Sequence, residues 1–343
     1  MDKQNIEKEV RQRKMDNSVL ERVREQAKAR PKRIVFPEAW DERVVVAAKQ
    51  VQEMGIAEPI MLHRDDIDTF EREIYANFLC EKKRNLTYEK SRELMESNLF
   101  FAAMMVRLGL ADGMVAGAAS STADVMRAVI YCMDVDERVG LITSCFLMAV
   151  PGCSAGEGGL IVFADCGVIP SPTSEQLAKI ALASAFFMEE ALDIPPRVAM
   201  LSYSSKGSAN HEDVTKVKDA VQIAQEMGYG IPIDGEMQVD SAIVPEIAAK
   251  KMGDSPVAGL ANVLVFPDLN SGNIGYKLTE RLAGARAIGP IILGTVQPCS
   301  DLSRGCSVED IVDCTAFTVM RAQSREKKKP LINMEKYYAN TRL

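Results

Sequence analysis

The segment from 289 to 312 gathers side chains of the kinds that enzymes use to hold phosphate and to move protons. Arg304 presents a forked set of donors that suits a phosphate group, and Ser303 can donate a hydrogen bond to a developing oxyanion. Asp310 can accept a proton if burial raises its pKa. Ser307 and Asp310 also have the spacing of a helix capping box, and on spacing alone the capping role is favoured.

Cysteine and histidine contribute little to this chemistry. Cys306 lies near Arg304 at an expected helix N-terminus, and both features favour a thiolate, but no histidine lies nearby in the sequence to act as its base. The chain contains two histidines, His63 and His211, so acid–base chemistry is expected to fall to a carboxylate. None of the eight cysteines forms a CxxC pair, which predicts reduced thiols and no zinc site.

Three junctions between an expected strand and an expected helix are rich in small polar residues: 117–127, 202–210 and 266–277. Ser, Thr, Gly and Asn let the backbone approach a ligand, and we expect them to leave N–H groups free for an anion. Each junction taken alone is better explained by caps and turns. Three of them in one chain favour a shared anionic ligand.

Two arginines, Arg127 and Arg281, lie within the helices that follow the first and third junctions. Each either reaches the anion or pairs with an acidic neighbour on its own helix. The chain has no GxxxxGK[ST] loop and no GxGxxG loop after a strand. ATP-dependent and NAD-dependent activities are therefore disfavoured.

The elements that must position these residues alternate between short β-branched strands and helices of about 10 to 20 residues. This order predicts an α/β fold with mainly parallel sheets flanked by helices. Strands are expected at 33–37, 59–62, 112–117, 141–150, 159–164, 198–203, 263–267 and 290–294, and helices at 1–30, 42–54, 88–108, 122–133, 174–192, 211–227, 274–283 and 308–323. The strands 141–150 and 159–164 are expected to pair across a Gly-rich turn, and Thr173 with Gln176 is expected to cap helix 174–192.

Composition limits the possible partners. With 41 basic and 48 acidic residues the chain has a net charge of −7, which argues against a protein that wraps nucleic acid. No apolar run approaches the roughly 18 to 20 residues of a membrane span. The N-terminal segment is charged from its second residue and has no apolar signal core, so we expect a cytoplasmic protein with small-molecule substrates.

Several longer stretches resemble one known family closely. They are ADGMVAGAASSTADVMRA, SYSSKGSA, GEMQVDSAIVPEIAAKK, SPVAGLANVLVFPDLNSGNIGYKL, RLAGARAIGPI and DLSRGCSVEDIV. In this order, from about residue 19 to 325, the sequence resembles the phosphate acetyltransferase (phosphotransacetylase) family, which is related to the phosphate butyryltransferases.

The resemblance implies reversible acyl transfer, in which acetyl-CoA and phosphate give acetyl phosphate and CoA, with CoA as a substrate and no cofactor or metal. It also implies a two-domain fold like that of isocitrate and isopropylmalate dehydrogenases, with the active site in the interdomain cleft. The first domain is expected to comprise 1–140 and 292–343, because the chain returns to it, and the second 141–291. Homodimers are usual in the family.

Carried over by position, the resemblance assigns Asp310 as the base that deprotonates the CoA thiol. Ser303 matches the residue that stabilises the tetrahedral transition state, and Arg304 matches the arginine that holds the phosphate of acetyl phosphate. The family role of Asp310 replaces the capping role as the favoured one, although one residue can serve both. Further substrate-binding candidates are Arg127, Arg281, Ser121, Thr122, Asn273 and Tyr276.

One position departs from the family pattern. Relatives often carry an arginine for CoA in an LRKxKGxT stretch, where this chain reads LCEKKRNLT with Glu81 at that place. Lys82, Lys83 or Arg84 are the possible substitutes, and Lys82 is the expected one. The alternatives to acetyl transfer are butyryl or propionyl transfer, a metal-dependent decarboxylating dehydrogenase of similar fold, and a non-catalytic acyl-CoA sensor.

Overall fold

The computed structural model describes residues 20–83 and 85–326 of the 343. Within these residues the chain forms two compact units. Unit 2 comprises 24–135 and 295–326, and unit 1 comprises 20–23 and 136–294. Unit 2 therefore contains the segment 299–310, which returns to it from unit 1.

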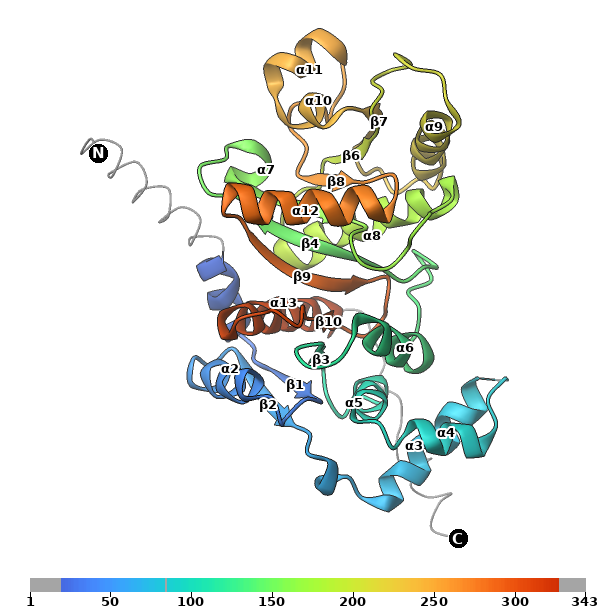
Figure 1. Ribbon diagram of the computed structural model, residues 1–343, viewed down its shortest axis with the longest axis vertical. Helices are drawn as coiled ribbons and strands as arrows, with labels where there is room; N and C mark the ends of the chain where they lie inside the picture. The colour runs from blue at the N-terminus through green and yellow to red at the C-terminus, as the bar shows by residue number, and fades with distance from the viewer. Residues whose placement is uncertain (1–19, 84, 327–343) are drawn as a thin grey trace, which may run out of the picture. The chain divides into compact units, whose positions relative to one another are not determined.

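Unit 2 is built on four parallel strands in the order β2-β1-β3-β10 (Figure 1). Their bounds are β1 Lys32–Phe36, β2 Ala57–Met61, β3 Gly113–Ala116 and β10 Cys299–Asp301. Because all pairings are parallel, the carboxyl ends of the strands meet at one edge of the sheet, called here the carboxyl edge. The loops that follow β1, β3 and β10 therefore begin side by side.

The helices of unit 2 bury apolar residues against this sheet. They are α2 Glu42–Glu53, α3 Thr69–Lys82, α4 Tyr88–Leu94, α5 Asn98–Arg107, α6 Thr122–Cys132 and α13 Val308–Glu326, with a short 3-10 turn η1 at Arg64–Asp66. Helix α13 packs on β1, β3 and β10 beside α2, and its Ile311 and Phe317 are fully buried. Gly113 allows this close packing, because a Cβ there would lie 2.6 Å from Cγ2 of Thr318.

Unit 1 is built on six strands in the order β9-β4-β5-β8-β6-β7. Their bounds are β4 Thr143–Ala149, β5 Leu160–Ala164, β6 Val198–Leu201, β7 Ile233–Met237, β8 Val263–Val265 and β9 Arg286–Leu293. Strand β4 runs antiparallel to both of its neighbours, and the remaining pairs are parallel. The sheet is thus mixed and mostly parallel.

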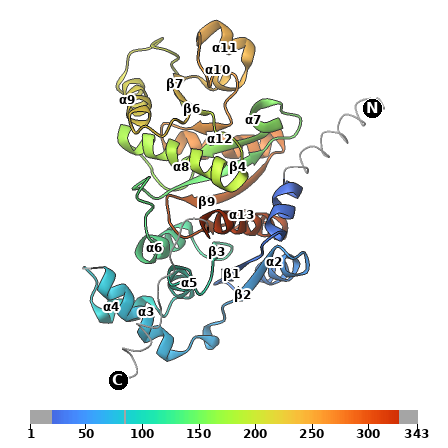
Figure 2. The ribbon, with the colours of Figure 1, turned by 180° about the vertical axis from the view of Figure 1, so that it is seen from behind.

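The helices of unit 1 are α7 Ala155–Gly158, α8 Ser174–Leu192, α9 Glu212–Glu226, α10 Val239–Ile243, α11 Pro245–Lys251 and α12 Leu269–Ala283. Helices α8 and α12 cover opposite faces of the sheet, as the two views show (Figures 1 and 2). Helix α8 is the more deeply buried, since 13 of its 19 residues are buried. In helix α12 the one buried residue is Gly272.

Several sequence predictions are confirmed. The fold is α/β, with mostly parallel sheets flanked by helices. Strands β4 and β5 pair antiparallel across the Gly-rich turn, and Thr173 with Gln176 forms a complete capping box. The described part of the predicted helix 1–30 is helical from 20 to 28, and the rest lies outside the described residues.

Other elements differ from the prediction. The single helix expected at 88–108 is two helices, α4 and α5, because Met95 ends the first and Ser97 begins the second. Helices α3, α7, α10 and α11 and strands β7 and β10 are not predicted by the sequence patterns. Among the described helices, none is long and apolar enough to cross a membrane.

Candidate active site

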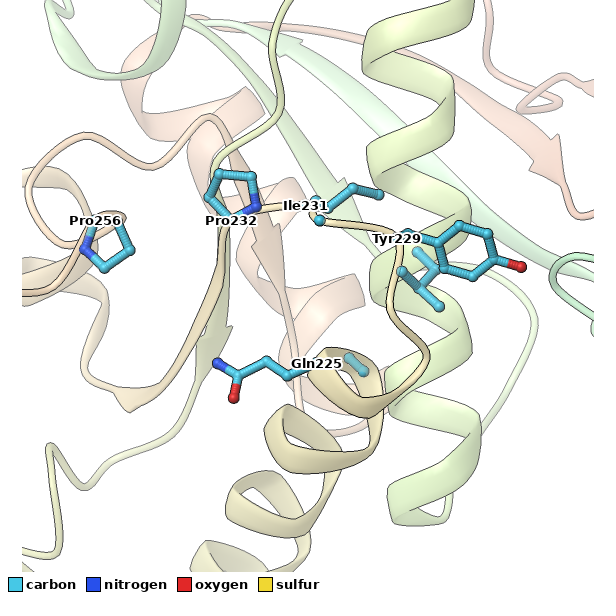
Figure 3. A pocket seen from close by; sticks show the side chains of 8 residues that line it. Gln225, Tyr229, Ile231, Pro232 and Pro256 are labelled. Carbon is cyan, nitrogen blue, oxygen red and sulfur yellow. The ribbon is translucent and has the colours of Figure 1, made fainter.

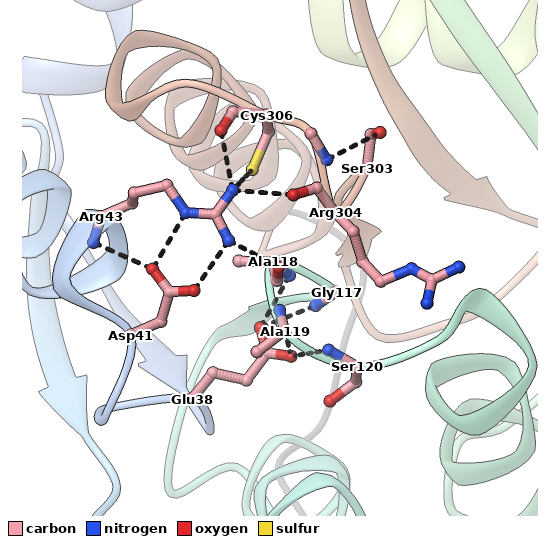
Figure 4. A network of polar contacts seen from close by, with 11 residues as sticks. Glu38, Asp41, Arg43, Gly117, Ala118, Ala119, Ser120, Ser303, Arg304 and Cys306 are labelled. Carbon is pink, nitrogen blue, oxygen red and sulfur yellow. Dashed lines mark hydrogen bonds and ion pairs between the residues drawn. The ribbon is translucent and has the colours of Figure 1, made fainter.

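The carboxyl edge of the unit 2 sheet brings together three loops that carry polar residues. They follow β1 at 37–41, β3 at 117–121 and β10 at 302–307. Figure 4 shows that these loops are joined by a network of hydrogen bonds and ion pairs. Two charged residues from the first loop and from α2, Glu38 and Arg43, hold the other two loops in place.

Glu38 is buried, with 1% of its surface exposed, and binds the loop after β3. Its Oε2 accepts hydrogen bonds from the backbone N–H groups of Gly117 (2.9 Å) and Ala118 (2.8 Å). Its Oε1 accepts from those of Ala119 (3.0 Å) and Ser120 (2.7 Å). The prediction that these N–H groups are free for an external anion is therefore wrong, because an internal carboxylate already occupies them.

Gly117 is required for this arrangement. Its φ is +108°, a region that L residues rarely adopt. A Cβ there would lie 2.6 Å from the backbone N and O of Leu302, and closer still to Oδ1 of Asp301. The loop after β3 thus packs directly against the loop after β10.

Arg43 connects the start of α2 to both of the other loops. Its Nε and Nη2 donate to the two carboxylate oxygens of Asp41 at 3.1 and 2.7 Å. Nη2 also donates to the carbonyl of Ala118 at 2.7 Å, and Nη1 donates to the carbonyls of Arg304 (2.8 Å) and Cys306 (3.0 Å). The hydrogen bond from Arg43 holds the pKa of Asp41 below its ordinary value, so this ion pair is charged at neutral pH.

The predicted catalytic residues Ser303 and Arg304 lie on the surface of the turn that Arg43 holds. The turn is closed by a hydrogen bond from Cys306 N–H to the carbonyl of Ser303 at 2.9 Å. The Arg304 side chain extends away from the network (Figure 4). Within the described residues its guanidinium has no ion-pair or hydrogen-bond partner, which leaves its donors available for an anion.

Asp310 lies in the first turn of α13, and its carboxylate oxygen Oδ2 accepts from Ser307 N–H (2.9 Å) and from Ser307 Oγ (2.8 Å). In return, Asp310 N–H donates to Ser307 Oγ at 3.2 Å. The capping arrangement predicted from spacing is confirmed. The carboxylate is half-buried and lies on the same segment as Ser303 and Arg304.

Asp301, the last residue of β10, is an important residue that the sequence patterns do not single out. Its side chain is fully buried, and neither carboxylate oxygen has a hydrogen-bond partner among the described residues. Burial, with a smaller contribution from the nearby Glu38, raises the pKa of Asp301 to about 7, although the Thr122 side chain and the backbone N–H of Leu302 lie close enough to lower it in part. Its signal in the sequence is only an acidic residue at the end of a short strand.

The predicted binding residues on α6 are at or near its first turn. Ser121 is the N-cap, with Oγ accepting from Asp124 N–H at 3.2 Å and donating to the Asp124 carboxylate at 2.7 Å. Thr122 lies next to Asp301. Arg127 is 60% exposed, and its Nη2 lies 3.9 Å from Asp124 Oδ1. An exposed pair at this distance is weak, so the Arg127 guanidinium remains accessible to a ligand.

Two further predictions concern Cys306 and Lys82. Burial raises the pKa of Cys306 to about 11, so its thiol is protonated at neutral pH and the disfavoured nucleophile role receives no support.

Lys82 lies at the C-terminal end of α3, with Nζ 5.8 Å from the ring centre of Phe78. Its neighbour Lys83 donates to the carbonyl of Ile130 at 3.0 Å, and Arg84 lies outside the described residues.

The remaining predicted residues lie on α12, in unit 1. Asn273 donates to the carbonyl of Cys166 at 3.2 Å. Tyr276 stacks on Phe146 with ring centres 4.0 Å apart, and burial raises its pKa to about 12. Arg281 is 80% exposed and lies 3.7 Å from Glu280.

The other two small-residue junctions also lie in unit 1, and carboxylates again bind several of their donors. Glu236, itself buried, accepts from Ser204 Oγ and from Gly207 N–H, both at 2.8 Å. Asp268 accepts from Ser271 N–H at 2.9 Å and caps α12. The expectation of free N–H groups is therefore wrong at these positions too, because caps and turns use the donors.

A pocket of about 330 Å³ lies at the end of α9 in unit 1 (Figure 3). Its lining is mainly apolar and includes Leu182, Gln225, Tyr229, Ile231, Pro232 and Pro256. None of the predicted site residues lines it, and it offers no charged group for acid–base work. No group of three or more His, Cys, Asp or Glu side chains in residues 20–83 and 85–326 is arranged to hold a metal ion.

Comparisons with known proteins agree on one family. The family model described as phosphate acetyl/butaryl transferase matches residues 18–319. A phosphate acetyltransferase of Thermoanaerobacterium thermosaccharolyticum is 45% identical over 327 residues, covering 89% of this chain and 100% of that protein. The crystal structure of a phosphotransacetylase from Streptococcus pyogenes is similar with a TM-score of 0.80 at 39% identity, covering 90% of this chain and 98% of the other. The EutD phosphotransacetylase from Staphylococcus aureus gives 0.78 at 36% identity, covering 90% and 99%.

Proposed function

Because the chain belongs to the phosphate acetyl/butyryl transferase family, we propose that the loops at the carboxyl edge of the unit 2 sheet perform its phosphate acetyltransferase reaction. In this reaction acetyl-CoA and phosphate give acetyl phosphate and CoA, reversibly. The observation that carries the proposal is the 303–306 turn, which is held by Arg43 and presents the guanidinium of Arg304, unpaired among residues 20–83 and 85–326. A forked, permanently charged donor set of this kind suits a phosphoryl group.

The proposed mechanism is direct transfer in a ternary complex. Asp310 takes the proton from the CoA thiol, whose ordinary pKa is about 8.5, and the sulfur attacks the carbonyl carbon of acetyl phosphate. Ser303 donates a hydrogen bond to the oxyanion that develops on the carbonyl oxygen. The carbon–oxygen bond to phosphate then breaks, and Arg304 holds the departing phosphate. Orientation of the two substrates supplies several kcal/mol, on the order of 7 to 11 in favourable cases.

The capping contacts of Asp310 are compatible with the role of a base. Ser307 fixes the direction of the carboxylate by donating to Oδ2. A general base requires a fixed direction, because the thiol that gives up its proton must lie within hydrogen-bond reach of the carboxylate. A carboxylate is also the available acid–base group here, because His63 and His211 lie on other segments. One residue therefore serves as cap and as base.

The remaining candidates are proposed to bind the substrates. Ser121 and Thr122 begin α6 directly after the loop that follows β3, and the exposed Arg127 lies in the second turn of the same helix. Lys82 is the proposed substitute for the family arginine at the Glu81 position, since Lys83 is engaged by a backbone carbonyl. In unit 1, Asn273, Tyr276 and Arg281 follow one another along α12.

The test is turnover of two variants, Arg304→Gln and Asp310→Asn, measured as CoA thioester formation from acetyl phosphate and CoA, with and without divalent metal. We expect each to lower kcat by at least about 100-fold with little change in Tm. Arg92→Gln is the control, because Arg92 is an exposed arginine of unit 2 paired with Glu73 away from these loops. Near wild-type kcat in both site variants would reject the proposed roles.

Acyl-chain preference follows from the size of the acyl pocket. We propose acetyl as the preferred group, because the relatives at 45% and 44% identity are phosphate acetyltransferases. Propionyl or butyryl transfer is the alternative, since one or two methylenes change discrimination by only about 1 to 3 kcal/mol. Rates with acetyl, propionyl and butyryl phosphate separate these. Tight CoA binding without any turnover would instead indicate a non-catalytic sensor.

We also propose a cytoplasmic homodimer. Its eight cysteines are free, as expected in a reducing compartment. Ile274, Leu278 and Leu282 recur every four residues on α12 and are 56%, 52% and 82% exposed, which supports a contact between two copies through this helix. Sedimentation equilibrium is expected to give a dimer that the Leu278→Glu/Leu282→Glu variant disrupts, whereas Ile130→Glu, at an exposed residue of unit 2, does not. A monomeric wild type would contradict the proposal.

A further inference from the structure

We propose that Arg43 is a positioning residue for acyl transfer, because its guanidinium holds the backbone of the turn from which Ser303 and Arg304 act. The inference rests on the roles proposed for those two residues. Arg43 contacts the turn at the carbonyls of Arg304 and Cys306 and, at 4.0 Å, at Sγ of Cys306, and not at the side chains of Ser303 and Arg304. It therefore acts through the position of other side chains.

The Arg43 guanidinium uses its full donor capacity. Its five N–H groups match five acceptors: two carboxylate oxygens of Asp41 and the carbonyls of Ala118, Arg304 and Cys306. These five hydrogen bonds are between 2.7 and 3.1 Å long. Lysine offers three donors from one nitrogen and cannot span acceptors on three separate segments in the same plane.

The Arg43 guanidinium is itself held in place by Asp41. Asp41 is the N-cap of α2, where its Oδ1 accepts from Arg43 N–H at 2.9 Å. The carboxylate also neutralises the guanidinium, and the side chains of Arg43 and Asp41 are largely shielded, at 33% and 14% exposure. Arg43 is thus unsuited to compete with Arg304 for a phosphate, and it transmits the position of α2 to the loop after β10.

The turn has few other means of keeping its shape. The local hydrogen bonds are Cys306 N–H to the Ser303 carbonyl (2.9 Å) and Gly305 N–H to Ser303 Oγ (3.3 Å). Ser303, Arg304 and Gly305 are all exposed, so packing does not fix them. Without Arg43 the carbonyls of residues 304 and 306 lose a charged donor, and the turn is free to shift.

Unit 2 contains a second arginine, Arg33, whose hydrogen bonds are similar to those of Arg43. A variant of Arg33 therefore serves as a control for loss of stability alone. Arg33 donates through Nε and Nη2 to the carboxylate of Asp112 at 3.1 and 2.8 Å. It also donates to the carbonyls of Leu110 and Gly109, both at 2.9 Å. It lies at the start of β1, at the opposite end of the strands from the 303–306 turn. Substitution of Arg33 therefore removes hydrogen bonds similar to those of Arg43 but leaves the proposed site unchanged.

The experiment compares Arg43→Lys, Arg43→Ala and Arg33→Lys in the full-length protein by kcat, KM and Tm. We expect kcat to fall about 10-fold in Arg43→Lys and on the order of 100-fold in Arg43→Ala, as for misplacement of reacting groups by about 1 Å. KM for acetyl phosphate should rise while KM for CoA changes less than about twofold, and added guanidinium ion should partly restore Arg43→Ala. Arg33→Lys should keep kcat within about twofold.

The inference is overturned if Arg43→Lys keeps wild-type kcat, or if Arg33→Lys lowers kcat as much as Arg43→Lys does at the same loss of Tm. If Arg43→Ala does not fold, Arg43→Lys alone decides. Arg304→Gln in the same assay distinguishes failure of the proposed active site from failure of the positioning role of Arg43. Full activity of the Arg304→Gln variant would contradict both the proposed site and the inference about Arg43. An inactive Arg304→Gln variant together with a fully active Arg43→Lys variant would contradict the inference about Arg43 alone.

Discussion

Replacing Asp301 by Asn tests the electrostatics at the carboxyl edge directly. Asp301 is fully buried beneath the loops after β1 and β3, with no hydrogen-bond partner for its carboxylate among the described residues. The charged group that acts on it is Glu38, which is held by four N–H groups of the loop after β3 and interacts in turn with Arg43. Asparagine has nearly the shape of the protonated acid and cannot ionise.

The magnitude follows from the raised pKa. Burial moves the pKa of Asp301 from its ordinary value of 3.8 to about 7. Between these two values the unfolded chain has released the proton and the folded chain retains it, so the free energy of unfolding falls as pH rises. At about 1.4 kcal/mol per pH unit, the loss is on the order of 4 kcal/mol. It is absent below about pH 4 and complete above about pH 7.

The assay is urea unfolding of the wild type and Asp301→Asn at matched pH values from 4 to 8.5. We expect the variant to gain stability relative to the wild type as pH rises, with most of the gain between pH 5 and 7. Asp112→Asn is a control of opposite sign, because the hydrogen bonds from Arg33 lower the pKa of Asp112 despite its partial burial. Because the pKa of Asp112 is lowered from 3.8, this change in protonation falls below about pH 4, so the deficit relative to the wild type should stay nearly constant across the assayed range. A stability difference for Asp301→Asn that is constant across this range would refute the assigned environment.

Three further changes give sharp outcomes. Glu38→Gln should lower the free energy of unfolding by on the order of 3 kcal/mol, because an amide offers one acceptor and turns an NH₂ group toward two of the four N–H donors; an unchanged urea midpoint would contradict this. Gly117→Ala should cost about 2 kcal/mol or more, since φ is +108° and the added Cβ meets Leu302, and a Tm equal to that of the wild type would be inconsistent with it. Cys306→Ser should keep kcat within about threefold, and alkylation of Cys306 should be slow below pH 9, because burial raises its pKa to about 11; rapid inactivation by iodoacetamide at pH 7 would show that the thiol is a thiolate.

Local patterns predicted local structure well. Helix α8 combines an apolar composition with a Thr173–Gln176 cap only three residues apart, so both signals lie within one stretch of sequence. Strands β4 and β5 are likewise apolar and separated by a short turn. The Ser307–Asp310 box was visible for the same reason.

Elements that depend on distant partners were not predictable in this way. Strands β7 and β10 contain buried acids that break the apolar pattern: Asp234 and Glu236 in β7, and Asp301 in β10. The partners that make the acids of β7 tolerable, such as Lys206 for Asp234 at 2.6 Å, lie on another segment. The roles of Glu38 and Arg43 depend on contacts 79 to 82 and 261 to 263 residues away, for which a single sequence gives no signal.

The Glu38 carboxylate serves as a built-in ligand for the loop after β3. A ring of backbone N–H groups that met only water before binding would have to be desolvated and ordered each time a substrate arrived, at the expense of affinity. Here that ordering is completed during folding, so the loop is preorganised and its entropy is not lost again in each catalytic cycle. In the proposed site, recognition of the phosphoryl group is thereby left to side chains, whose identity evolution can change without altering the backbone.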